Sequence, residues 1–187
     1  MTIIRDVVQD RFGARLGSGV HPPNDDLPCA NEAASVARGI EWTDNPAAVG
    51  LPDMRPINDA PWTSPEGRAR GLVPLMEALW EWESWSAERR GAWTQAVAQR
   101  TIAEVLPIAL RAVGLEAEAA RCETEPTGAS AKGAARAAWA AATEAAWAAR
   151  AAWAAATEGA AWAAAAEEVL QLACRIWIEE AESGEAA

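Results

Sequence analysis

Residues 129–166 read ASAKGAARAAWAAATEAAWAARAAWAAATEGAAWAAAA, and 24 of these 38 residues are alanine. Residues 134–147 recur as 148–162, with one residue added at Gly159. Alanine is the strongest helix former, and glycine is the weak interior position of this stretch. The sequence therefore predicts one helix over 133–182, roughly 75 Å long at about 1.5 Å per residue, or two helices that break near Gly159.

The tryptophans of this helix lie on one side of it. With about 100° per residue and Trp139 at zero, Trp153, Trp147 and Trp162 fall between about −40° and 140°, and the sector from about 180° to 300° holds no large side chain. A smooth alanine face lets another helix approach closely, and tryptophan is enriched at protein interfaces. Two interpretations stay open: the Trp side packs on the N-terminal domain of the same chain, or it forms an arm for self-association or partner binding.

The formal net charge is −11 and is spread over the whole chain. No basic patch is available for phosphate contacts, so direct nucleic-acid binding is not expected. The charge either keeps an alanine-rich protein soluble or favours a partner that is basic or itself binds nucleic acid. The alanine run is not expected to span a membrane, because Arg136, Glu144, Arg150 and Glu158 interrupt it.

The three cysteines, Cys29, Cys122 and Cys174, are far apart and show no metal-binding spacing. This usage predicts free thiols in a reducing cytoplasm, and no cofactor or metal is expected. The N-terminus carries Arg5 and Asp6 inside its apolar stretch and does not resemble a signal peptide.

No run alternates with period two, so we predict an all-α helical bundle with a long Ala/Trp-rich C-terminal helix or helical hairpin. Predicted helices begin at Thr2, Pro28, Ser64, Ser86 and Leu115. The helix from Ser86 to Gly114 carries two apolar stripes, which indicates burial on two sides. The composition of 123–128 is typical of a linker, so we expect a compact domain over 1–125 and a helical arm over 126–187.

The helix that begins at Ser64 has its apolar stripe at i, i+3, i+4 and i+7, and Pro74 is expected to kink it. Trp85 points away from that stripe if the helix continues. Either the helix ends near Ser84, or Trp85 is a surface aromatic and a further candidate for partner binding.

Polar residues gather between 21 and 59, and the candidate catalytic residues are His21, Cys29, Glu32, Asp44, Asn58 and Asp59. His21 is the single histidine, so any Cys–His pair must use it. Cys29 is expected in the first turn of a helix, where the dipole lowers the pKa of a thiol, and Glu32 shares its face. The alternative is structural: Cys29 in the core and Asn58-Asp59 capping a short helix.

The N-terminal region contains His21, PCANEA at 28–33, GIEWTDNP at 39–46, RPIND at 55–59 and a predicted helix that contains Arg68 and Pro74. In these motifs, over about 21–125, it resembles a family of uncharacterised bacterial and phage proteins in which a similar region precedes Ala-rich helices. The resemblance implies an all-α fold and carries no activity. The Ala-rich half is loosely similar to toxin-immunity proteins with Ala-repeat helices.

We favour an acidic helical protein-binding module of the immunity, antitoxin or phage anti-defence kind, which occupies the surface of another protein. Its candidate anchors are Trp85, Trp139, Trp147, Trp153 and Trp162. One alternative is a homo-oligomeric structural or assembly protein whose alanine face closes between chains. The other is an enzyme of unidentified reaction that uses the region of His21, Cys29 and Glu32.

Overall fold

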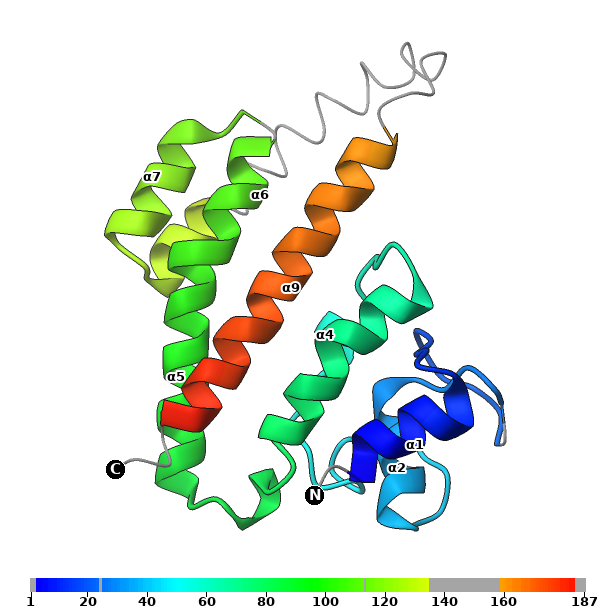
Figure 1. Ribbon diagram of the computed structural model, residues 1–187. Coiled ribbons are helices and arrows are strands. Elements are labelled where there is room, and N and C mark those ends of the chain that lie inside the picture. Colours follow the sequence, from blue (N-terminus) through cyan, green and yellow to red (C-terminus); the bar gives the residue numbers. More distant parts are fainter. Residues whose placement is uncertain (1–2, 24, 113, 135–158, 184–187) are drawn as a thin grey trace. The chain divides into compact units, whose positions relative to one another are not determined.

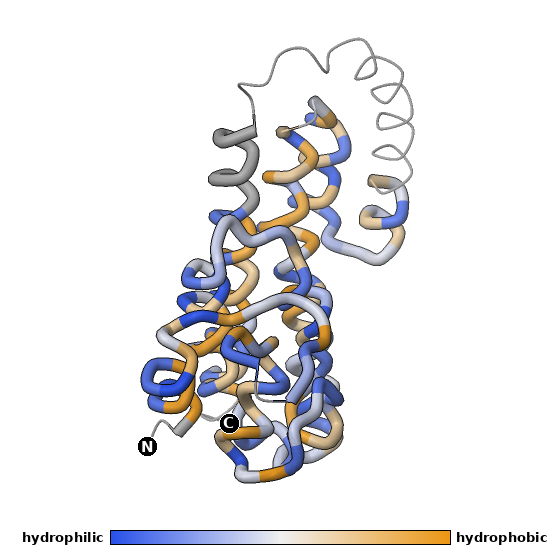
Figure 2. Tube along the Cα trace, turned by 90° about the vertical axis from the view of Figure 1, so that its right-hand side faces the viewer, coloured by the Kyte–Doolittle hydropathy of each residue, from blue (hydrophilic) through white to orange (hydrophobic). Residues whose placement is uncertain are grey.

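The computed structural model describes residues 3–23, 25–112, 114–134 and 159–183, except for the side chains of residues 3 and 159–166. Within these residues the chain is all-α and forms no strand, as the sequence predicts. Figure 2 shows hydrophobic and hydrophilic residues interleaved along the helices, as expected for helices that bury one face. No described helix is long and apolar enough to cross a membrane.

The chain divides into two compact units, Met1–Trp93 with Ala166–Ala187, and Thr94–Ala165. This grouping differs from the expected division at residue 125, because the C-terminal residues belong with the N-terminal helices. The boundary near residue 94 falls inside a helix rather than in a linker.

Three helices form the core of the first unit: α1 (Ile3–Phe12), α2 (Ala30–Arg38) and α4 (Pro65–Ala78). Each packs against the other two (Figure 1). The short helix α3 (Arg55–Asn58) lies in the connection between α2 and α4. Apart from Glu32 and Pro28, the large side chains buried most completely are aliphatic or thioether groups: Ile4, Val8, Leu16, Val49, Met54, Leu72, Leu75, Met76, Leu79 and Ile176.

Helix α2 buries polar residues as well as apolar ones. Its apolar residues Val36 and Ala37 are only half-buried. By contrast, the polar residues Asn31, Glu32 and Ser35 are buried. Neighbouring segments therefore surround the first two turns of α2 on all sides, and its polar side chains must find partners inside the protein.

Helix α4 begins as predicted. The Ser64 hydroxyl accepts a hydrogen bond from the Gly67 N–H at 2.9 Å, and Pro65 occupies the first helical position. Pro74 lies inside the helix, which continues to Ala78. Pro74 therefore does not end the helix, and the expected kink stays a prediction.

Helix α9 (Gly159–Ser183) contributes its residues from 166 onward to the first unit. The Gln171 amide donates to the Gly67 carbonyl at 3.2 Å, and Arg70 pairs with Glu167 at 3.1 Å. These contacts fix α9 beside α4. Residues 135–158 lie outside the described residues, so the choice between one helix over 133–182 and two helices stays open.

Four tryptophans form a cluster around the start of α5 (Ala87–Arg100), and Trp82 belongs to the 3₁₀ turn η1 (Trp82–Ser84). The ring centroids of Trp82 lie 5.2 Å from Trp85 and 5.0 Å from Trp93, and Trp93 lies 5.3 Å from Trp177. Distances of this size are typical of favourable aromatic pairs.

Trp85 is only 6% exposed, and the Arg89 guanidinium covers its ring at 3.8 Å. Helix α4 ends at Ala78, before Trp85, so of the two alternatives the one in which the helix stops before Trp85 holds, and Trp85 is not a surface aromatic. As a candidate partner-binding residue, Trp85 is covered by its own chain.

In the second unit, the helix expected up to Gly114 contains a π-helical turn, η2 (Thr101–Val105), followed by α6 (Leu106–Ala112). The extra residue of a π turn rotates the following side chains by about 100° relative to a continuous α-helix. After this turn, Ile108 is 42% exposed, whereas Leu110 is buried. Gly114 ends the helix with a left-handed φ of 77°, as predicted.

Helix α7 (Glu116–Thr124) packs against α6, and a further helix begins at residue 128, with its described part ending at 134. The sequence assigns 123–128 to a linker, but Glu123 and Thr124 still belong to α7. A small buried cluster holds this unit together: Leu110, Ala119, Cys122 and Ala134, with Ile102, Leu106 and Leu115 packed against it.

Candidate functional site

The Glu32 carboxylate is completely buried at the centre of a polar cluster. Its Oε1 accepts the His21 backbone N–H at 2.7 Å, and its Oε2 accepts the Cys29 backbone N–H, also at 2.7 Å. The His21 ring nitrogen Nδ1 lies 2.8 Å from the same Oε2. Three of the residues expected to be catalytic therefore meet in space, with both carboxylate oxygens occupied.

The same cluster caps the N-terminus of α2. Cys29 is the N-cap residue, and a reciprocal capping box joins the Cys29 and Glu32 side chains to each other's backbone N–H groups. The Ala30 N–H is bonded to Asn58 Oδ1 at 3.1 Å. Because these N–H groups already have partners within the protein, this helix end does not offer them to an anion.

Cys29 does not have the pKa expected from a position at the start of a helix. Burial, as the largest effect, raises the pKa of its thiol to about 12, and the negative charge of Glu32 also raises it. The expected lowering by the helix dipole is wrong because loss of water disfavours the thiolate more than the helix end favours it. A nucleophilic role at neutral pH would need a thiolate that these surroundings oppose.

Asn58 and Asp59 extend the cluster toward the surface. Asn58 Nδ2 donates to Asp59 Oδ1 at 2.6 Å, and that oxygen also accepts the Gly19 N–H at 2.8 Å. The buried Arg68 guanidinium donates to the Asn58 carbonyl at 2.8 Å and to the Leu16 carbonyl at 3.0 Å. Carbonyl acceptors thus replace the water that burial removes from this cation.

Asp44 joins the cluster only through its main chain, because its carbonyl accepts the Asn31 amide at 2.8 Å. The other amide atom, Asn31 Oδ1, is buried without a hydrogen-bond partner among the described residues. No group of three or more His, Cys, Asp or Glu in the described part of the chain is arranged to hold a metal ion.

The cluster fixes one loop that the sequence did not single out. The N–H groups of Gly19 and His21 are bonded to Asp59 and Glu32 respectively, and between them Val20 is 72% exposed. The His21 carbonyl accepts the Trp42 indole N–H at 3.0 Å. The apolar side chain of Val20 is therefore exposed to solvent, while hydrogen bonds hold the backbone at Gly19 and His21.

A glycine at position 17 is needed for this loop to close. A Cβ atom built on Gly17 would lie 2.6 Å from the Leu27 carbonyl oxygen and 2.8 Å from the His21 ring. The Gly17 N–H bonds to the Pro28 carbonyl at 2.7 Å. The loop therefore crosses directly over the entry to α2.

The remaining candidate anchors for a partner belong to the Ala/Trp helix. Trp139, Trp147 and Trp153 lie outside the described residues, and Trp162 lies in α9 with a side chain that is also outside them. The proposed Trp row therefore stays a prediction.

No protein-family profile, curated protein or solved structure matches the chain. The resemblance to the bacterial and phage family stays a prediction, and the function must be argued from the residues themselves.

Proposed function

We propose that the protein is an acidic, helical protein-binding module, and that Val20 is an anchor of its recognition surface. The observation that carries this proposal is the pair of hydrogen bonds from Gly19 to the exposed Asp59 and from His21 to the buried Glu32, on either side of a strongly exposed valine. As an immunity, antitoxin or phage anti-defence factor, such a module acts by occupying the surface of another protein.

Exposed aliphatic side chains are common, so exposure alone does not identify an anchor. The local restraint distinguishes Val20, because a loop that is already ordered loses less conformational entropy when a partner binds. Trp42, half-buried and bonded to the same loop, adds the kind of amphipathic ring that is enriched in binding surfaces.

The charges near Val20 in the sequence and in the cluster favour a basic partner. Asp25 and Asp26 follow the loop, Arg15 offsets one of these charges by pairing with Asp26 at 3.9 Å, and Asp59 is exposed while it holds Gly19. The net charge of −11 adds a long-range attraction for a positively charged surface. A basic protein is therefore a more favourable partner than an acidic one.

The cluster itself supports binding better than catalysis. Glu32, Cys29 and Asn58 all serve the N-terminus of α2, and the Cys29 thiol has a raised pKa. These residues therefore have a structural role, and the cluster that they form holds the loop around Val20.

The proposal is tested by affinity capture from a lysate of the native host with three forms of the full chain: wild type, Val20→Ser and Ile108→Ser. Ile108 is the matched control, because it is another exposed aliphatic residue in a different unit. We expect a stoichiometric basic partner on the wild type and on Ile108→Ser, with at least about tenfold less on Val20→Ser. Equal capture by Val20→Ser, or no stoichiometric partner on any form, contradicts the proposal.

A further inference from the structure

A groove of about 280 Å³ lies between α1 and α4 and shares no residue with the Val20 loop. Val8 and Val73, both buried, and Pro74 give it an apolar floor. Arg5, Gln9 and Arg70 line its edges. The residues that the structure describes along this groove include no carboxylate, although the protein as a whole carries a net charge of −11.

Pro74 gives this groove a backbone acceptor. In a continuous α-helix, the carbonyl of residue 70 accepts the N–H of residue 74, but proline has no N–H to donate. Arg70 and Pro74 both line the groove. The carbonyl oxygen of Arg70 therefore does not receive this intrahelical hydrogen bond.

The two arginines retain donors for a ligand. Arg5 uses Nε and Nη2 toward Glu77, and Arg70 uses Nη2 toward Glu167, whereas a guanidinium has five N–H donors. Both arginine side chains are more than half exposed, whereas Glu77 and Glu167 are each only 17% exposed, so a ligand carboxylate would share the arginines with these glutamates rather than displace them.

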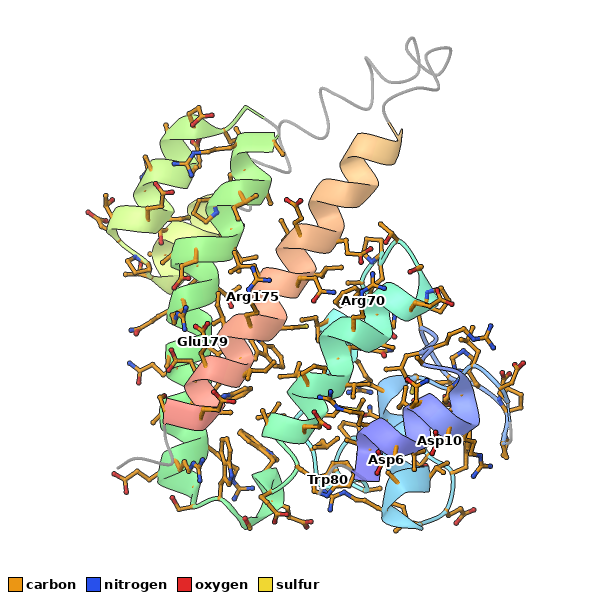
Figure 3. The ribbon with its side chains drawn as sticks, in the orientation of Figure 1. Asp6, Asp10, Arg70, Trp80, Arg175 and Glu179 are labelled. Atoms are coloured by element: carbon orange, nitrogen blue, oxygen red, sulfur yellow. The ribbon has the colours of Figure 1, made fainter. Side chains whose placement is uncertain are left out.

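The acidic residues of α1 lie on another side of that helix. Asp6 and Asp10 are about 110° and 150° around the helix from the centre of Arg5, Val8 and Gln9. Figure 3 shows the two aspartates on α1 and Arg70 on α4. These aspartates therefore lie away from the groove, and the carboxylates that contact its two arginines are Glu77 and Glu167.

We infer that the groove binds the carboxy-terminal residue of another polypeptide, provided that this residue has an apolar side chain. The terminal carboxylate pairs with Arg5 and Arg70, the side chain packs on Val8, Val73 and Pro74, and the last backbone N–H donates to the Arg70 carbonyl. A fatty acid offers the carboxylate and the apolar chain but no N–H donor. The backbone acceptor thus favours a peptide, and this inference does not depend on the Val20 surface.

The test uses an acetylated pentapeptide, GSTAV, with a free carboxylate, titrated into the ¹⁵N-labelled full chain. We expect the amide signals of residues 8, 9 and 69–73 to shift. The same peptide with an amidated C-terminus is expected to bind at least about tenfold more weakly, because it cannot form the charge-assisted bonds. Decanoate is expected to bind more weakly than the free peptide acid.

Four variants complete the experiment. Arg5→Gln and Arg70→Gln each remove a groove cation and should weaken binding about tenfold; Gln9→Trp should block the groove. Arg55→Gln is the matched control, since Arg55 is equally exposed and forms a similar ion pair with Asp53. Equal binding of acid and amide, tighter binding of decanoate, or wild-type affinity in both groove-arginine variants would overturn the inference.

Discussion

Two cysteine thiols, those of Cys29 and Cys174, are held in surroundings that oppose ionisation. Burial raises the pKa of each thiol to about 12, and for Cys174 the positive charge of Arg175 only partly offsets this effect. An exposed thiol in the unfolded chain ionises near about 8.5 to 9. Folding therefore keeps both thiols protonated through a pH range in which the unfolded chain loses these protons.

This difference predicts a loss of stability in alkali. Between about pH 9 and 12 the unfolded state binds fewer protons than the folded state, so the free energy of unfolding falls as pH rises, and the contribution is fully present below about pH 9. By pH 10 each thiol accounts for about 1.4 kcal/mol. Urea unfolding at pH 8, 9 and 10, followed by Trp fluorescence, measures the loss.

Few other side chains titrate in this pH range, because the chain has no tyrosine and Lys132 is its single lysine. The variants Cys29→Ala and Cys174→Ala should each remove part of the slope between pH 9 and 10, whatever they do to stability at pH 7. A midpoint that does not move up to pH 10, or a slope that both variants retain, contradicts the prediction.

The residue types of the polar cluster could be recognised in the sequence, but their roles could not. Spacing brings Cys29 and Glu32 to one helix end, and only the fold adds His21 and Asn58 to it. The pKa of the Cys29 thiol is raised because the thiol is buried, and its position at a helix start does not reveal this burial. Val20 was missed because its exposure comes from the path of the loop rather than from a motif.

At the level of elements, two glycines in helices have opposite surroundings. A Cβ atom on Gly71 in α4 would lie 2.5 Å from the Trp62 ring and 3.4 Å from Cys174 Sγ. Gly91 in α5 is exposed and has nothing within 4 Å of its Cβ position. The Trp62 ring cannot easily withdraw, because its indole N–H is bonded to the Ile57 carbonyl at 2.8 Å.

The same substitution should therefore change stability in opposite directions. Gly91→Ala should stabilise the protein by up to about 1 kcal/mol, since alanine is the better helix former. Gly71→Ala gains the same helix propensity but must displace a packed indole, so we expect a net loss of about 1 to 3 kcal/mol. Thermal or urea unfolding of the two variants at pH 7 measures both signs. A stabilised Gly71→Ala would show that α4 is not packed this closely against Trp62.

Helix starts could be predicted because capping is local: Ser64 and Pro65 mark the beginning of α4 by their own chemistry. The π turn η2 could not be predicted, since no single residue type produces it. Periodicity thus predicts that a helix exists, whereas an inserted residue decides which face is buried after it.

At the level of the whole molecule, the large buried side chains are unequally divided between the two units. The first unit contains most of the large side chains that are fully buried, among them Leu72, Leu75, Met76 and Leu79 on or directly after α4. In the second unit, the buried cluster around Leu110 includes the small residues Ala119, Cys122 and Ala134. The fold class follows from helical patterning, but the pairing of residues 166–187 with the N-terminal helices is long-range and has no local signal.

Because hydrophobic stabilisation grows with buried apolar area, the second unit should open at a lower free energy than the first. Native-state hydrogen exchange should give amides of α7 protection factors about 100-fold lower than those of α4. Cys122→Ser, which places a hydroxyl in the small cluster, should speed exchange in α7 and leave α4 unchanged if the units open separately. Equal protection of α7 and α4, or equal acceleration of both by this variant, would mean that the chain opens as a single cooperative unit.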